Sequence, residues 1–82
     1  MRIRMTSHGR DRAAERGISQ DDIREVLRAP YMSYPGKTSR VCYVGTTTDG
    51  RAIVVCTAHT LEESPDSAKV VSVWERGTQD EQ

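Results

Sequence analysis

A histidine and two arginines recur at a spacing of four residues near the start of the chain: His8, Arg12 and Arg16. If this segment is helical, the three side chains share one stripe. Cleavage of RNA without a metal needs a base for the 2′-hydroxyl proton, an acid for the leaving oxygen and cations beside the phosphate. Imidazole titrates near neutral pH, and guanidinium groups bind phosphate in bidentate fashion. The stripe therefore predicts a phosphodiester site with His8 as acid or base.

Each of these side chains also has a structural interpretation. His8 could simply pack at a helix N-terminus, and the two arginines could form salt bridges with Asp11, Glu15 or the acids of the second helix. Three further residues are candidates for binding, namely His59, Lys69 and Tyr43. For His59 the alternative is a solvated position near a polar loop, and for Lys69 it is an ordinary charge at a strand edge.

Length and composition predict one small domain. The chain has 82 residues, 35% of them hydrophobic and none of them Phe. We expect one core in residues 1–76, with Trp74 as an anchor rather than a base-stacking platform, and a disordered acidic tail at 77–82. No apolar run approaches the roughly 18 to 20 residues of a membrane span, so we expect a cytoplasmic protein with no membrane partner.

Charge is balanced overall but uneven along the chain. The formal net charge is zero, which argues against strong nonspecific binding to nucleic acid. Residues 1–46 nevertheless hold nine Lys or Arg against five Asp or Glu, whereas residues 47–82 hold three against seven. A basic face built from the first half of the chain and a mixed solvated surface both fit this distribution.

Local patterns predict a strand and two helices in the first 30 residues. Met1, Ile3 and Met5 alternate with polar residues, as in a strand with one buried face. A helix capped by Thr6 or Ser7 should end at about Arg16, with Gly17 beyond it. Ser19 caps the next helix, whose buried stripe is Ile23, Val26 and Leu27, and Pro30 stops it.

The rest of the chain changes to an extended pattern. Residues 31–39 predict a loop, and strands are expected at 40–46, 51–60 and 69–76. The resulting fold is α+β with the order β-α-α-β-β-β, in which two short helices cover one face of an antiparallel sheet and consecutive strands are neighbours.

Two cysteines, Cys42 and Cys56, are expected to be buried thiols, with a disulfide as the alternative. A two-residue loop at Asp49-Gly50 would place them on opposite faces of the hairpin. A three-residue loop, Thr48 to Gly50, would place them directly across from each other. The sequence does not choose between these registers. No CxxC or Cys/His cluster with metal-ligand spacing occurs, so neither a metal nor another cofactor is implied.

The segment His8-x3-Arg12-x3-Arg16-Gly17-Ile18-Ser19 resembles the signature of a family of short bacterial domains of unknown function. The family pattern continues with a second helix, a tyrosine-bearing strand, a turn glycine, an aliphatic strand and a closing strand. This chain supplies those later parts as Tyr43, Asp49-Gly50, 53–55 and 70–74. Gly9 stands where the family often has Ala, and Ala13 departs from the pattern too.

This resemblance implies a RelE-like fold, because such domains are grouped with the RelE-like and BrnT-like toxins of bacterial toxin–antitoxin pairs. It implies a toxin-like, metal-independent ribonuclease or a degenerate relative, with RNA as substrate and an antitoxin or another protein as partner. The alternative function is a noncatalytic module that binds protein or RNA through its sheet face.

Overall fold

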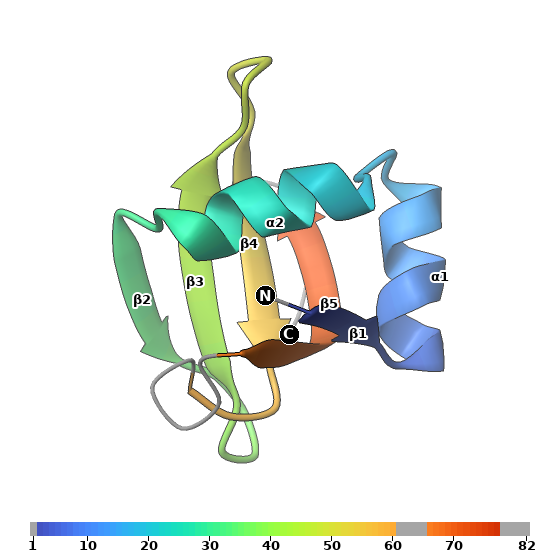
Figure 1. Ribbon diagram of the computed structural model, residues 1–82, viewed down its shortest axis with the longest axis vertical. Coiled ribbons are helices and arrows are strands. Elements are labelled where there is room, and N and C mark those ends of the chain that lie inside the picture. The colour runs from blue at the N-terminus through green and yellow to red at the C-terminus, as the bar shows by residue number, and fades with distance from the viewer. Residues whose placement is uncertain (1, 61–65, 78–82) are drawn as a thin grey trace.

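The computed structural model describes residues 2–60 and 66–77 (Figure 1). Its elements, in chain order, are β1 (Arg2–Met5), α1 (Ser7–Glu15), α2 (Gln20–Arg28), β2 (Met32–Pro35), β3 (Val41–Thr46), β4 (Ala52–Thr57) and β5 (Ser67–Glu75). The predicted α+β fold is confirmed. Most of the loop expected between the last two strands, and the tail expected beyond Gly77, lie outside the described residues.

Both helices begin and end where the sequence predicts. Thr6 caps α1 by accepting a hydrogen bond from the backbone N–H of Gly9, and Gly17 follows the helix with φ +64°. Ser19 caps α2 in a capping box with Asp22. The caps satisfy backbone N–H groups that lack partners within each helix. Local chemistry therefore fixes where each helix begins.

The five strands form one mixed sheet in the order β1-β5-β4-β3-β2. The expected antiparallel pairing holds from β3 to β5 but needs correction at β1, which pairs parallel to β5. Alternation of apolar residues indicates which face of a strand is buried and carries no information on which strand lies beside it. The two helices that follow β1 separate it from the hairpins, so its place beside the last strand is a property of the whole fold.

One strand was not expected from the sequence. β2 lies within the segment predicted as a loop and pairs antiparallel with β3 along its whole length. It is a four-residue edge strand that ends at Pro35, and three of its residues are exposed. Because it buries so little, it leaves no alternating pattern, and pairing with β3 rather than composition makes it a strand.

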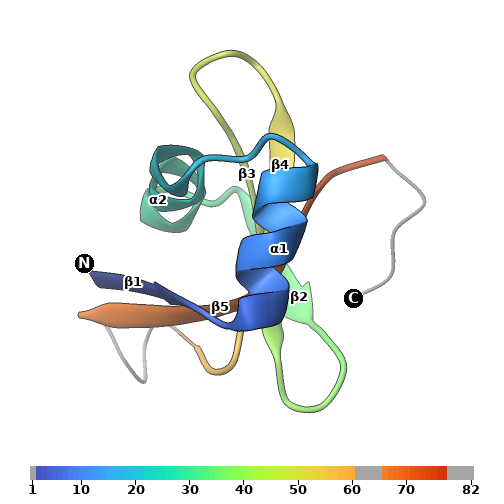
Figure 2. The ribbon, with the colours of Figure 1, turned by 90° about the vertical axis from the view of Figure 1, so that its right-hand side faces the viewer.

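The helices cover one face of the sheet only, and α2 crosses over β3 and β4 in Figure 1. Under them lies a core that joins Ile23, Val26 and Leu27 to strand residues such as Val55 and Val73. Figure 2 shows the first half of β5, with β1, bent away from β3 and β4 toward the side of α2. This bend begins near Val71, an extra residue in β5 opposite the Cys56–Thr57 step of β4.

The other sheet face, which we call the helix-free face, has an apolar cluster of its own. It consists of Cys42, Val44, Val54, Cys56, Val71 and Trp74, with Tyr34 and Ala58 packed against it. Trp74 is 5% exposed, which confirms its expected role as a core anchor. The helix-free face is therefore an apolar layer without a helix over it in the described part of the chain.

The cysteines form a disulfide, so the expectation of two buried thiols is wrong. Thr47 and Arg51 pair through a backbone hydrogen bond of 2.9 Å, and the hairpin therefore has the three-residue loop, with Gly50 at φ +88°. That register places Cys42 directly across from Cys56, with both side chains fully buried. The disulfide follows from the loop length, which Asp49-Gly50 alone does not specify.

Candidate functional site

The predicted stripe of His8, Arg12 and Arg16 lies along α1 and becomes less accessible toward its C-terminal end. His8 is exposed in the first turn. Arg12 is half-buried, and its Nη1 forms an ion pair of 2.9 Å with Glu15 Oε1. Arg16, at the helix C-cap, donates a hydrogen bond of 2.8 Å from Nη1 to the main-chain oxygen of Val73 in β5. The stripe thus runs from solvent into the junction between α1 and the sheet.

Both guanidinium groups therefore have structural partners. The Arg12–Glu15 pair is one turn long and partly solvated, so its contribution to stability is small. The Arg16 contact joins a helix end to a strand 57 positions away, and a charged donor makes it one of the stronger types of hydrogen bond. The geometry of α1 leaves His8 as the member of the stripe that is open to solvent along its side chain.

The other three candidates do not join this stripe. Tyr43 is 8% exposed and packs in the core beneath the helices. His59 is half-buried in the segment after β4, where its main-chain oxygen accepts a hydrogen bond of 2.6 Å from the Thr57 hydroxyl. Lys69 is exposed on β5, and its neighbours Ala68 and Val70 belong to the helix-side core. Lys69 therefore points to the helix-free face.

Lys69 has two cationic neighbours that sequence reasoning did not select. β1 and β5 pair in register, so that Arg4 lies beside Lys69 and Arg2 beside Ser67. Ile3 and Met5 contact the helix-side core, and the two arginines between and before them therefore face the other way. Arg2, Arg4 and Lys69 are all exposed. We call these three residues the cationic row of the helix-free face.

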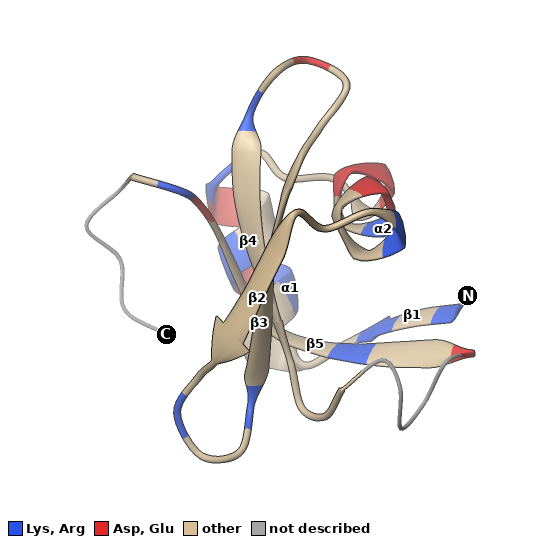
Figure 3. Ribbon diagram, turned by 90° about the vertical axis from the view of Figure 1, so that its left-hand side faces the viewer, with Lys and Arg blue, Asp and Glu red and all other residues tan. Residues whose placement is uncertain are grey.

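Charge is unevenly distributed on the molecule (Figure 3). Blue segments mark β1, the first half of β5 and the β2–β3 connection in the lower half of the view, with one red segment at the start of β5, whereas α2 and the β3–β4 hairpin in the upper half carry red and blue segments together. Lys37 and Arg40 belong to that β2–β3 connection. The described strand residues of the helix-free face include no Asp or Glu, but the exposed Asp66 directly precedes Ser67, the partner of Arg2. Glu62 and Glu63, between β4 and β5, lie outside the described residues.

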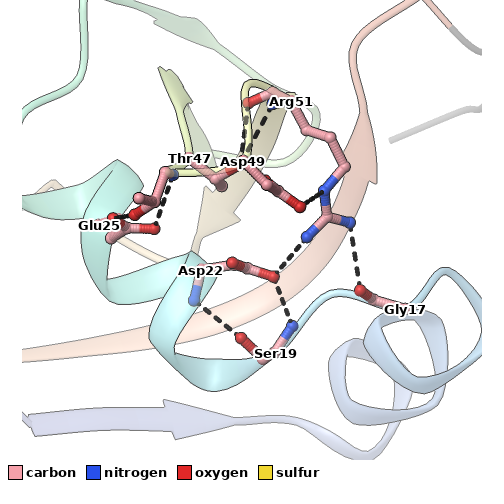
Figure 4. Close-up of polar contacts among 8 residues, drawn as sticks. Gly17, Ser19, Asp22, Glu25, Thr47, Asp49 and Arg51 are labelled. Atoms are coloured by element: carbon pink, nitrogen blue, oxygen red, sulfur yellow. Dashed lines mark hydrogen bonds and ion pairs between the residues drawn. The ribbon is translucent and has the colours of Figure 1, made fainter.

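A polar cluster ties the β3–β4 hairpin to the helices at the opposite end (Figure 4). Arg51 binds Asp22 at 2.7 Å, Asp49 at 3.0 Å and the main-chain oxygen of Gly17 at 3.2 Å. Glu25 accepts hydrogen bonds from the backbone and the hydroxyl of Thr48. The Thr47 hydroxyl and Arg51 stabilise the ionised carboxyl of Asp49 and lower its pKa. Every charge in this cluster has a partner within it, so its role is structural.

The pocket of about 500 Å³ beside this cluster lies between α2 and the hairpin tip. Residues between Asp21 and Arg28, together with Thr48 and Asp49, line it, and no member of the α1 stripe does. In residues 2–60 and 66–77, no group of three or more His, Cys, Asp or Glu side chains is placed to hold a metal ion. No helix in the same part of the chain is long and apolar enough to cross a membrane.

A family model described as "Domain of unknown function (DUF4258)" matches residues 5–75, nearly the whole described fold. The chain belongs to this family. No curated protein and no solved structure is significantly similar to it. The match includes α1 with the stripe of His8, Arg12 and Arg16, and it ends at the last residue of β5.

The cationic row of this DUF4258 domain could have been found in the sequence only in part. Arg2 and Arg4 alternate with Ile3 and Met5, which predicts that both arginines face away from the core. Lys69 is 65 positions from Arg4, and the parallel pairing that brings the two together leaves no local signal. The row therefore emerges from the topology of the sheet.

Proposed function

We propose that this DUF4258 domain is a noncatalytic module that binds RNA through the helix-free face of its sheet. The observation that carries the proposal is the cationic row, in which Arg2, Arg4 and Lys69 stand exposed on two adjacent strands. Phosphate oxygens are the natural partners of such a row because Lys and Arg release the counterions that surround a nucleic-acid backbone. The family that the sequence resembles is grouped with ribonuclease toxins, and for that reason we take RNA as the polyanion that this row binds.

The α1 stripe supports the noncatalytic form of this proposal. A phosphate bound there would compete with Glu15 for Arg12 and with the Val73 carbonyl for Arg16. A phosphate bound to the cationic row would not have to displace a partner of its side chains on β1 or β5. The zero net charge of the chain fits as well, because unevenly distributed charge gives a local positive field without general affinity for polyanions.

A toxin-like ribonuclease is the second proposal, and the exposure of His8 favours it. His8 is exposed in the first turn of α1, where its imidazole is accessible to a substrate, and imidazole is the side chain most often used as acid or base. In this version Arg12 and Arg16 hold the phosphate, which requires them to exchange their contacts with Glu15 and the Val73 carbonyl for it. With the ribonuclease we also propose an antitoxin or another protein as partner. Under both proposals the protein is cytoplasmic.

The test measures binding of a single-stranded RNA of about 12 nucleotides by fluorescence anisotropy between about 50 and 200 mM salt. The variant Arg2→Ala/Arg4→Ala should weaken binding and reduce the slope of log K against log salt by about 1.4, that is, about 0.7 per lost phosphate contact. The control Arg10→Ala/Arg28→Ala removes two exposed arginines from the helices and should leave the slope unchanged.

Equal effects of the two double variants would overturn the cationic row as the binding site. Gel analysis of the same mixtures reports cleavage. Intact RNA after long incubation is expected, whereas cleavage by the wild type that disappears in His8→Ala would replace the module with the ribonuclease. Failure of the folded wild type to bind RNA at the lowest salt would overturn both proposals and leave a protein partner as the remaining reading of the sheet face.

A further inference from the structure

At the far edge of the helix-free face, β2 brings exposed aromatic and apolar side chains together. Tyr31 is 53% exposed and Met32 is 40% exposed, the largest exposed apolar side chains of the described residues. Met32 and Tyr34 pair with Val44 and Cys42, both members of the apolar cluster of this face. In a sheet, directly paired residues point to the same side, so Met32 and Tyr34 lie on the helix-free face.

Arg76 connects this edge to the end of β5. It follows β5, and its backbone N–H donates a hydrogen bond of 2.7 Å to the main-chain oxygen of Ala52. Its Nη1 donates a hydrogen bond of 2.9 Å to the hydroxyl of Tyr31, which precedes β2. Since β4 and β3 lie between β5 and β2, the hydrogen-bonded side chains of Arg76 and Tyr31 together span two strands. Trp74, two residues before Arg76, belongs to the apolar cluster of the helix-free face, so alternation along β5 places Arg76 and the Tyr31 hydroxyl on that face.

These residues form a surface on which a planar group can stack. The Arg76 guanidinium is hydrogen-bonded to Tyr31, and burial raises the pKa of the nearby Tyr34 phenol while the charge of Arg76 acts in the opposite direction. A guanidinium beside aromatic rings is the combination that holds unpaired bases in sequence-tolerant binding of single strands. We call Tyr31, Met32, Tyr34 and Arg76 the aromatic edge.

We infer that the aromatic edge stacks unpaired bases, so that this domain selects single-stranded over double-stranded RNA. The inference rests on the proposed RNA-binding function and names its substrate class. Phosphates lie on the cationic row and bases on the aromatic edge. The cationic row lies on β1 and the first half of β5, whereas the aromatic side chains lie at β2, on the other side of β4 and β3. An extended single strand of several nucleotides is needed to reach from one to the other.

A duplex cannot make both contacts. Its bases are stacked and paired inside the helix, and it presents phosphates and groove edges to the protein. Double-stranded RNA should therefore use the cationic row alone. A single strand gains about 5- to 150-fold in affinity from one stacked base, which corresponds to the 1 to 3 kcal/mol measured for base–aromatic stacking.

The experiment compares single- and double-stranded RNA of the same sequence on the wild type, Tyr31→Ala and Tyr31→Phe. Tyr31 is more than half exposed, so both variants should keep the unfolding midpoint of the wild type. The wild type should prefer the single strand at least fivefold. Tyr31→Ala should lose this preference, and Tyr31→Phe should keep it, because the ring stacks without its hydroxyl. A single strand with 2-aminopurine should show fluorescence quenching with the wild type and Tyr31→Phe only.

Each outcome separates this inference from the proposed function. Equal binding of single and double strands, with Tyr31→Ala unchanged and the charge variants weakened, would overturn the aromatic edge and keep the RNA-binding module. Affinity that does not rise between oligonucleotides of about four and eight residues would also overturn it. Absence of RNA binding by the folded wild type would overturn the module itself, and then the aromatic edge would have no bases to stack.

Discussion

Arg16 donates a hydrogen bond to the main-chain oxygen of Val73 and so joins the end of α1 to the middle of the helix-covered sheet. This contact gives Arg16 a structural role. Its spacing from His8 and Arg12 had predicted phosphate binding instead. Spacing on a helix determines which side chains share a stripe. The packing of the helix determines which of them meet solvent, and α1 turns its last member toward β5.

Arg16→Ala should destabilise the fold by about 1 to 3 kcal/mol, because it leaves a partly buried carbonyl without a charged donor. Arg16→Lys should recover part of the loss, since a lysine keeps the charge but not the planar geometry. Urea denaturation reports the free energy of unfolding, with Arg10→Ala as an exposed control from the same helix that should change it by less than about 0.5 kcal/mol. Equal stability of wild type and Arg16→Ala would return Arg16 to the list of phosphate ligands.

The pKa of Asp49 gives a prediction for acid. Hydrogen bonds from Thr47 and Arg51 lower it below its ordinary value, so the folded state binds the Asp49 proton less readily than the unfolded chain does. The stabilisation is fully present above the unfolded pKa of about 4 and is lost as the pH falls through the folded pKa. Asp49→Asn should therefore show a shallower loss of stability with acid between about pH 5 and pH 2.

Urea midpoints measured across that pH range test this sign. Asp11→Asn serves as the control, because Asp11 is an exposed acid on α1, outside the hairpin cluster. If both variants follow the wild-type curve, the hydrogen bonds to Asp49 do not distinguish the folded from the unfolded state, and the hairpin cluster contributes no acid sensitivity through this residue.

The disulfide between Cys42 and Cys56 closes a loop with a sequence separation of 14, which in the chain-entropy model corresponds to about 3 kcal/mol. Cys42→Ala/Cys56→Ala should lower the free energy of unfolding by about that amount relative to the oxidised protein. Thiol titration of the denatured, nonreduced protein should find no free thiol. Two free thiols would restore the original reading of the sequence.

The disulfide between Cys42 and Cys56 can also be used to test the proposed cytoplasmic location. Disulfides are rare in the cytosol, where thiols are kept reduced. Trapping of thiols in intact cells, before lysis, reports whether the bond forms there. A cytoplasmic protein should be trapped with both cysteines reduced and should form the bond only after isolation.

How far the sequence predicts this fold depends on whether the deciding interactions are local. The caps of both helices, the buried stripe of α2 and the burial of Trp74 follow from neighbouring residues or from hydropathy, and all of them were predicted. The edge strand β2, the parallel partner of β1 and the disulfide depend on pairing between segments far apart in the chain. No local pattern encodes such pairing, because several registers satisfy the same alternation.

The candidate site divides in the same way. The stripe of α1 was predictable as a stripe, and its exposure was not. The cationic row combines a local signal in β1 with Lys69, whose neighbours appear only once β1 lies beside β5. The aromatic edge depends on β2 and on a contact between Tyr31 and Arg76 that are 45 positions apart. The composition of this segment alone predicts a loop.

Gly9 sets how closely α1 can approach β5. A Cβ at this position would lie 2.8 Å from the main-chain oxygen of Val70, too near for an unaltered backbone. Alanine favours a helix by about 1 kcal/mol over glycine, but overpacking costs about 1 to 3 kcal/mol, so Gly9→Ala should lower stability by about 1 kcal/mol. The urea midpoint measures the change. Ala14→Gly, an exposed site on the same helix, isolates the propensity effect and should cost about 1 kcal/mol. A gain in stability from Gly9→Ala would mean that α1 can move away from β5, and the hydrogen bond from Arg16 to Val73 would then no longer fix the position of the helix.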